Sequence, residues 1–177
     1  NVSLELPLFR VRAVPNPDLE SESSDGFDIG LRWYGLRSTA RVSVFRTDYT
    51  NFIETKVNIG VDLVSGYTQF QSQNIEDTTI EGIEAGWKLR FGDTEQFMFD
   101  GSAFYARGDN KGTGKPVNSV GPAQAVVGFS WFSADETREL RLKSTLADAY
   151  DRVDESASEL FKPAGYTVFD LYFTQKL

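Results

Sequence analysis

The stretch GFDIGLRWY, residues 26–34, alternates strictly between apolar and polar side chains. One side carries Phe27, Ile29, Leu31 and Trp33, and the other carries Asp28, Gly30, Arg32 and Tyr34. A period of two is typical of a β-strand whose two faces meet different surroundings. The stretch therefore predicts a strand that separates an apolar environment from a polar one.

The same alternation recurs along the chain. It is clearest in EGIEAGWKLRF, residues 81–91, and in AQAVVGFSW, residues 123–131. Further alternating segments cover 38–52, 96–107, 139–148 and 165–177. We read 67–91 as one long strand, because splitting it would place the turn at Gly92 on the wrong side of the sheet. The chain is therefore expected to be all-β and antiparallel.

The connections between these strands alternate in length. Short turns are expected at 35–37, 92–95 and 134–137, and long polar loops are expected at 53–66, 108–123 and 149–164. Short connections at one end and long connections at the other are typical of an outer-membrane β-barrel. A strand of 67–91 exceeds the roughly 10 residues that cross a membrane, so its first half should project beyond the bilayer.

A soluble β-sandwich would show the same alternation of apolar and polar side chains, so the alternation alone does not identify a barrel. The tryptophans favour the barrel. Trp33, Trp87 and Trp131 fall on the apolar faces near short turns, as in the aromatic girdle of a membrane barrel. Polar side chains line the opposite faces of the same strands. We therefore expect an antiparallel transmembrane β-barrel.

Composition excludes several classes of function. The net charge is −8, which argues against a nucleic-acid partner, because such partners select basic surfaces. The chain has no cysteine and no histidine. It therefore lacks thiolate metal ligands and the usual general base, and we expect neither enzymatic activity nor a bound metal.

Five segments, in order, carry a resemblance to a known family. They are NPDLESESSDGFDIGLRW (16–33), VFRTDYTNFIE (44–54), FQSQNIEDTTIEGIEAGW (70–87), ARGDNKGTGKPVNSVGPAQAVVGFSW (106–131) and PAGYTVFDLYFTQKL (163–177). The first resembles the NPDL box of TonB-dependent outer-membrane receptors. The fourth resembles a segment of the haem, haemoglobin and transferrin receptor branch of that family.

The resemblance implies a domain organisation and a location. Residues 1–177 would be the C-terminal part of a roughly 22-stranded receptor barrel, with the plug domain and the final strands absent. Such receptors lie in the outer membrane of Gram-negative bacteria, among lipid and lipopolysaccharide. Their plug connects them to the TonB–ExbB–ExbD complex.

The resemblance also implies a function, namely import of haem or of iron from haem proteins. Haem is then the transported ligand rather than a resident cofactor, and a haem-carrying protein is the expected partner. Two alternatives stay open: a receptor for a ferric siderophore or another nutrient, and a passive outer-membrane barrel. The first gains weight because the histidine that such haem receptors place before the NPDL box is missing from LFRVRAVPNPDL, residues 8–19.

Two sets of candidate residues follow. Tyrosine can ligate haem iron, although each tyrosine could equally be an aromatic residue that packs against its neighbours. The turn residues of the NPDL box could contact the ligand, or they could only fix the position of the strand that follows. The candidates for ligand binding are Asn16, Asp18, Tyr49, Tyr67, Tyr105 and Tyr150. The candidates for contact with the plug are Arg32, Glu84, Lys88, Arg90 and Asp100.

Overall fold

The computed structural model describes residues 4–155 and 162–176. These residues form two sheets and one short 3₁₀ helix, η1 (Pro7–Phe9). Within the described ranges, no helix has the length and apolar character needed to cross a membrane. The expectation of an all-β, antiparallel fold is confirmed for the larger sheet.

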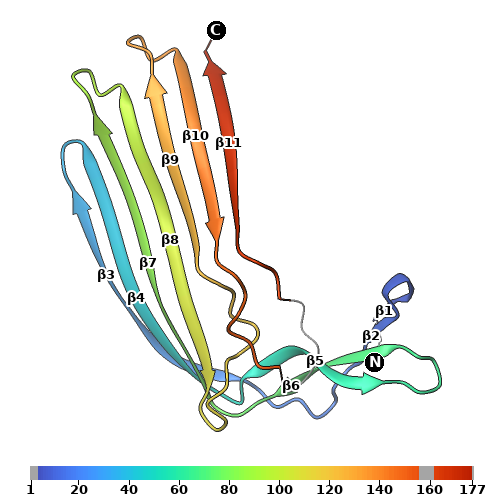
Figure 1. The fold of residues 1–177 in the computed structure, drawn as a ribbon. Helices are drawn as coiled ribbons and strands as arrows, with labels where there is room; N and C mark the ends of the chain where they lie inside the picture. Colours follow the sequence, from blue (N-terminus) through green and yellow to red (C-terminus); the bar gives the residue numbers. More distant parts are fainter. Residues whose placement is uncertain (1–3, 156–161, 177) are drawn as a thin grey trace.

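The larger sheet, here called the wall, has seven antiparallel strands in the order β11-β10-β9-β8-β7-β4-β3. Its strands are β3 (Ser23–Tyr34), β4 (Ser38–Thr50), β7 (Thr78–Phe91), β8 (Phe97–Asn110), β9 (Gln124–Phe132), β10 (Arg138–Ala147) and β11 (Tyr166–Gln175). The three predicted short turns join β3 to β4, β7 to β8 and β9 to β10, all at one end of a curved sheet (Figure 1).

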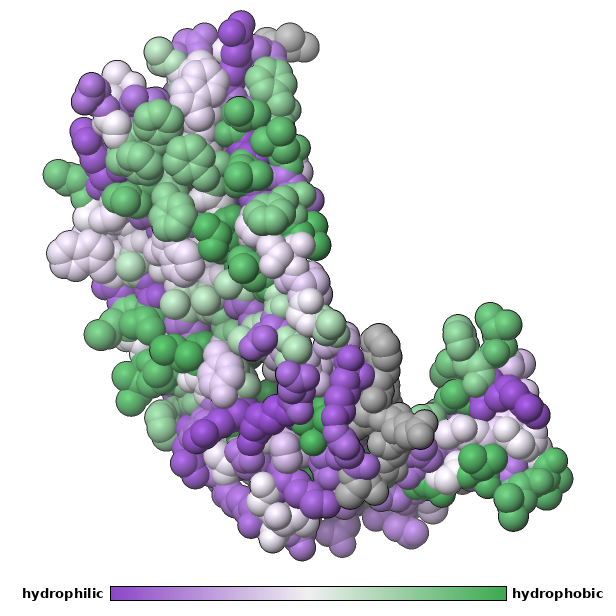
Figure 2. Space-filling view, viewed as in Figure 1, coloured by the Kyte–Doolittle hydropathy of each residue, from purple (hydrophilic) through white to green (hydrophobic). Residues whose placement is uncertain are grey.

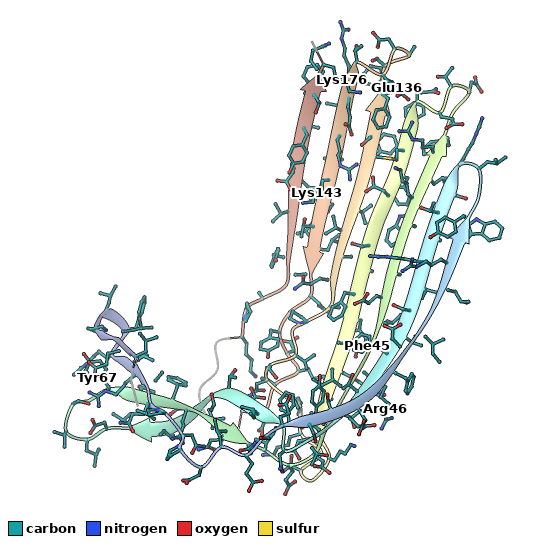
Figure 3. All side chains as sticks on the ribbon, turned by 180° about the vertical axis from the view of Figure 1, so that it is seen from behind. Phe45, Arg46, Tyr67, Glu136, Lys143 and Lys176 are labelled. Atoms are coloured by element: carbon teal, nitrogen blue, oxygen red, sulfur yellow. The ribbon has the colours of Figure 1, made fainter. Side chains whose placement is uncertain are left out.

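The smaller sheet, here called the arm, projects from the opposite end of the wall (Figure 1). Its order is β1-β2-β6-β5, with β1 (Leu4–Leu6), β2 (Val11–Ala13), β5 (Ile53–Val61) and β6 (Thr68–Asn74). The arm holds Tyr67, whereas Glu136 and Lys176 lie at the short-turn end of the wall (Figure 3).

The arm corrects two predictions. The segment 53–66 is not a loop throughout, because β5 occupies most of it. The segment 67–91 is not one strand: it divides at residues 75–77 into β6, which pairs with β5, and β7, which pairs with β4. Its first half lies in the arm, which projects from the wall (Figure 1); that it projects beyond the bilayer stays a prediction. The predicted loop 149–164 is irregular where it is described, and 156–161 and Leu177 lie outside the described residues.

Register gives the wall two chemically distinct faces, since residues directly opposite each other in neighbouring strands point to the same side. The face that contains Trp33 also contains Ala40, Trp87 and Trp131 and is apolar along most of its length. We call it the apolar face. Its side chains are strongly exposed, with Leu31 at 74% and Leu171 at 70%. In the view of Figure 2, hydrophobic patches lie along the wall among polar residues, and hydrophilic residues gather most densely at the long-loop end.

Candidate functional site

The other face of the wall, here called the polar face, carries the charged candidates. Register brings all five residues proposed for plug contact to this side: Arg32, Glu84, Lys88, Arg90 and Asp100. It also adds Arg41, opposite Arg32, and Lys143, opposite Asp170. Sequence reasoning missed Arg41 and Lys143, although the alternation in 38–52 and 139–148 was available to place them.

A chain of hydrogen bonds links three strands on the polar face, near the short turns. Both terminal nitrogens of Arg141 bind the carboxylate of Asp100, at 2.9 and 2.8 Å. Arg141 also donates to Ser130 Oγ at 3.0 Å, and the Ser130 hydroxyl donates to Glu139 at 2.9 Å. Ser130 is fully buried. The network therefore fixes three neighbouring strands, β8, β9 and β10, from the polar side.

Glycine at position 128 makes this network possible. Gly128 in β9 lies directly between Asp100 in β8 and Lys143 in β10. A Cβ atom there would lie 2.4 Å from Arg141 Nη2 and 3.0 Å from Asp100 Oδ1. The bare backbone lets the arginine side chain cross β9 to reach the carboxylate.

The side chains of the candidates Arg90 and Asp100 are therefore already bound to other residues of this chain. Asp100 is held by Arg141, while Arg90 lies 3.4 Å from Glu136 in a short turn and over the ring of Phe132, 4.9 Å from its centroid. Arg32, Arg41 and Lys88 differ, since none forms an ion pair with any residue in 4–155 or 162–176. We call these three the basic cluster.

At the long-loop end, two segments fold together into what we call the loop cluster, residues 111–122 and 148–155. Asn118 holds them by two bonds to the backbone of Asp154: Nδ2 to the carbonyl at 3.0 Å, and the Asp154 amide to Oδ1 at 2.7 Å. The Tyr150 hydroxyl donates to the Asn118 carbonyl, and Arg152 pairs with Asp109. The two loops therefore form one connected surface.

The loop cluster also contacts the start of the arm. The Ser119 hydroxyl donates to Glu54 at 3.4 Å. Burial raises the pKa of Glu54, and the Ser119 bond opposes that shift only in part. Burial, followed by the nearby charge of Glu54, raises the pKa of Tyr150. These groups form a partly buried contact between the loops and the arm, and the pKa values of Glu54 and Tyr150 are both raised there.

The NPDL segment serves as a connector in this structure. Asn16 uses both ends of its amide, donating to the Ser72 carbonyl and accepting from the Asp18 backbone, each at 3.0 Å. Asn74 binds the amide and carbonyl of Glu20 at 2.8 and 3.1 Å. These bonds tie the segment to β6 and fix where β3 begins, while the Asp18 side chain stays exposed.

The four candidate tyrosines are not brought together. Tyr49 packs edge-on against Phe52 near the loops, with ring centroids 5.1 Å apart. Tyr67 lies in the arm with Arg12 stacked over its ring at 5.3 Å. Tyr105 stands opposite Ile83 on the apolar face, and Tyr150 lies in the loop cluster. Among the described residues, no group of three or more acidic side chains could hold a metal ion.

The chain matches a known protein family and several relatives. A family model described as "TonB dependent receptor-like, beta-barrel" matches residues 5–177. The chain is 33% identical over 92 residues to hemoglobin and hemoglobin-haptoglobin-binding protein B of Haemophilus influenzae, covering 49% of this chain and 8% of that protein. It is 26% identical over 196 residues to hemoglobin-haptoglobin utilization protein B of Neisseria meningitidis, covering 93% and 24%.

Solved structures share the fold. The copper transporter OprC superposes with a TM-score of 0.77 at 21% identity, covering 90% of this chain and 24% of that one. A mutant of the ferric enterobactin receptor of Pseudomonas aeruginosa gives a TM-score of 0.64 at 23% identity, covering 94% and 25%. The chain thus spans a quarter or less of these relatives. It belongs to the family of TonB-dependent receptor β-barrels.

Proposed function

We propose that this chain is part of the wall of an outer-membrane receptor that imports haem, or iron taken from haem proteins. The observation that carries the proposal is a wall with one apolar and one polar face, found together with relatives named for binding haemoglobin. In this arrangement lipid covers the apolar face, and the polar face lines the interior of the barrel.

The position of the loop cluster supports capture of a large ligand. It lies at the long-loop end together with the arm (Figure 1), which in an outer-membrane barrel faces the outside of the cell. The partner at this end would be a haem-carrying protein. Energy would come from the TonB–ExbB–ExbD complex, acting through parts of the receptor beyond residues 1–177.

A ferric siderophore is the second candidate ligand. The chain is 27% identical over 122 residues to the ferrienterobactin receptor of Escherichia coli, covering 68% of this chain and 16% of that protein. The absence of histidine from all 177 residues also favours a ligand that needs no imidazole at iron.

Growth of a receptor-deletion strain separates these candidates. The full-length receptor is restored in the strain, and haemoglobin, free haem or a ferric siderophore is supplied as the sole source of iron. Growth on haemoglobin and haem that depends on TonB is the expected result. Rescue by siderophore alone would contradict the haem assignment, and growth independent of TonB would indicate a passive barrel.

A further inference from the structure

Two phenylalanines interrupt the polar face of the wall, and neither is among the candidates from the sequence. Phe45 in β4 stands opposite Asp28, and Phe104 in β8 stands opposite Glu84 and Gln124, so both point to the polar side. Their ring planes make an angle of 12°, and the ring centroids lie 6.3 Å apart. We call these two residues the aromatic pair.

Glycine at position 82 lets the pair form across β7. Gly82 stands directly opposite Phe45, and an added Cβ atom there would lie 2.6 Å from Cζ of the Phe45 ring. The ring therefore lies over the bare backbone of β7 and extends toward β8, which carries Phe104. Phe45 stays half-buried and Phe104 is 39% exposed. The pair thus keeps aromatic surface open on the polar side of the wall.

The aromatic pair lies next to the loop cluster. Figure 3 shows Phe45 nearer to the arm than to the short turns. Gly108 in β8 lies on the same face, two residues beyond the partner of Gly82. An added Cβ atom at Gly108 would lie 3.2 Å from Val117 Cβ and 2.8 Å from Val120 Cγ2, so the loop cluster packs onto this face. A ligand that passes the loop cluster therefore meets the aromatic pair next.

Charges beside the pair are distributed unevenly. Arg41 and Phe104 line one hollow of about 250 Å³, whereas Asp28 and Phe45 line another of about 340 Å³. Glu84 lines both hollows. Arg41 forms no ion pair with any residue that the structure describes, and the rest of the basic cluster continues from it toward the short turns. The pair is therefore basic on the side of Arg41 and acidic on the side of Asp28.

A flat apolar anion fits this arrangement. A broad planar ring system gains contact energy by facing aromatic rings, and small-molecule sites combine such apolar surface with a few placed polar groups. A carboxylate at one edge of the ring system would bind Arg41, since a guanidinium matches a carboxylate through two parallel hydrogen bonds. The porphyrin of haem has both properties, because its flat macrocycle carries two propionate groups on one edge.

We propose that the aromatic pair binds the porphyrin face of haem on the inner side of the wall, with the propionates directed toward Arg41 and away from Asp28. The proposal rests on the proposed function, because it takes haem as the transported ligand. The site recognises the macrocycle and not the iron: the chain has no histidine, and Tyr105, next to Phe104, points to the apolar face.

Binding of metal-free protoporphyrin IX to the purified full-length receptor tests the site, with the fluorescence anisotropy of the porphyrin as the readout. Phe45→Leu and Phe104→Leu keep an apolar side chain and remove the ring. Each should weaken the affinity between about twofold and tenfold, which corresponds to the loss of an aromatic contact. Phe99→Leu is the matched control, because Phe99 lies in the same strand at 38% exposure but on the apolar face; its affinity should not change.

Charge variants test the orientation of the porphyrin. Arg41→Gln should weaken the binding of protoporphyrin IX roughly two- to fivefold, as expected for loss of a partly exposed ion pair. Glu84→Gln should strengthen binding by a similar factor, because it removes the acid that both hollows share. The dimethyl ester of protoporphyrin has no propionate charge, so it should bind the wild-type receptor and Arg41→Gln equally. A loss in Arg41→Gln that persists with the ester overturns the proposed orientation.

Three results overturn the site itself: unchanged affinity in both aromatic variants, an equal loss in Phe99→Leu, or a wild-type receptor that binds haem but not metal-free protoporphyrin. Growth assays separate these results from failure of the proposed function. If the wild-type receptor supports TonB-dependent growth on haem while both aromatic variants bind protoporphyrin normally, only the site is wrong. If the wild-type receptor supports growth on a ferric siderophore alone, the import function is wrong and the site falls with it.

Discussion

Arg141 in β10 holds Asp100 in β8 across the whole width of β9, with Nη1 and Nη2 at 2.9 and 2.8 Å from the two carboxylate oxygens. The side chains are about three-quarters buried, each with 25% exposure. A charged pair at this depth is costly to separate, because the partner left behind stays poorly solvated. The bond therefore couples three strands of the wall.

Replacing Gly128 by alanine should break this coupling. The new Cβ would lie 2.4 Å from Arg141 Nη2, so the guanidinium must move away from Asp100. We expect a loss of roughly 1–3 kcal/mol in the free energy of unfolding, measured by urea titration of the refolded receptor. Gly121→Ala is the matched control, since its Cβ would meet no atom within 4 Å; an equal loss in both variants would refute the explanation.

Val126 and Val127 are adjacent in β9 and provide a test of the two faces. Val127 lies opposite Gly101 and Ser144 on the apolar face, whereas Val126 lies opposite Ser102 and Thr145 on the polar face. Val127→Arg should cost roughly 2–4 kcal/mol if that side meets the middle of the bilayer. The amount of heat-modifiable folded barrel in outer-membrane fractions measures the effect.

The contrast between the two valine variants is the decisive result. Val126→Arg should assemble close to normally, because an arginine on the polar face can reach water or another polar group. Equal impairment of both variants would mean that the faces are wrongly assigned.

Asn118→Ala should loosen the loop cluster and leave the wall intact. The substitution removes the bonds at 3.0 and 2.7 Å to the Asp154 backbone. We expect faster proteolysis of 148–155 and a local loss of about 1–2 kcal/mol, with an unchanged unfolding midpoint for the barrel. Asn58→Ala is a suitable comparison, since among the described residues the Asn58 side chain accepts only from the Gly60 amide within the arm. Protection of 148–155 should then stay normal.

The contact between the loops and the arm should strengthen in acid. Burial raises the pKa of Glu54 above its unfolded value, so the protonated form is favoured when the loop cluster is packed. This contribution to the stability of the contact is fully present below the pKa that Glu54 has in the unfolded chain. It is lost as the pH rises through the raised pKa of Glu54 in the folded protein. Hydrogen exchange of 111–122, corrected for intrinsic rates, should show more protection at about pH 4 than at about pH 7.

Glu54→Gln tests the assignment of this pH dependence. The amide keeps a similar shape and cannot ionise, so the difference in protection between the two pH values should largely disappear. An unchanged pH dependence in the variant would assign it to another group.

The alternation of side chains was sufficient to predict the strands of the wall, since period two is a local property of the sequence. It also placed Trp33, Trp87 and Trp131 on one face, as the register confirms. The arm was missed because β5 pairs with β6 through two register shifts, between Glu54 and Val57 and between Asn58 and Gly60. Bulges of this kind interrupt the alternation that identifies a strand.

The sequence by itself determined that the chain is antiparallel β-structure with one apolar and one polar face, because each strand carries that information in its own residues. Only the tertiary structure decided which charges are satisfied. Asp100 and Arg141 are 41 positions apart in sequence, and their contact depends on strand register and on the open backbone at Gly128. The same register placed Arg32, Arg41 and Lys88 next to one another on the polar face, where none of them forms an ion pair with a described residue.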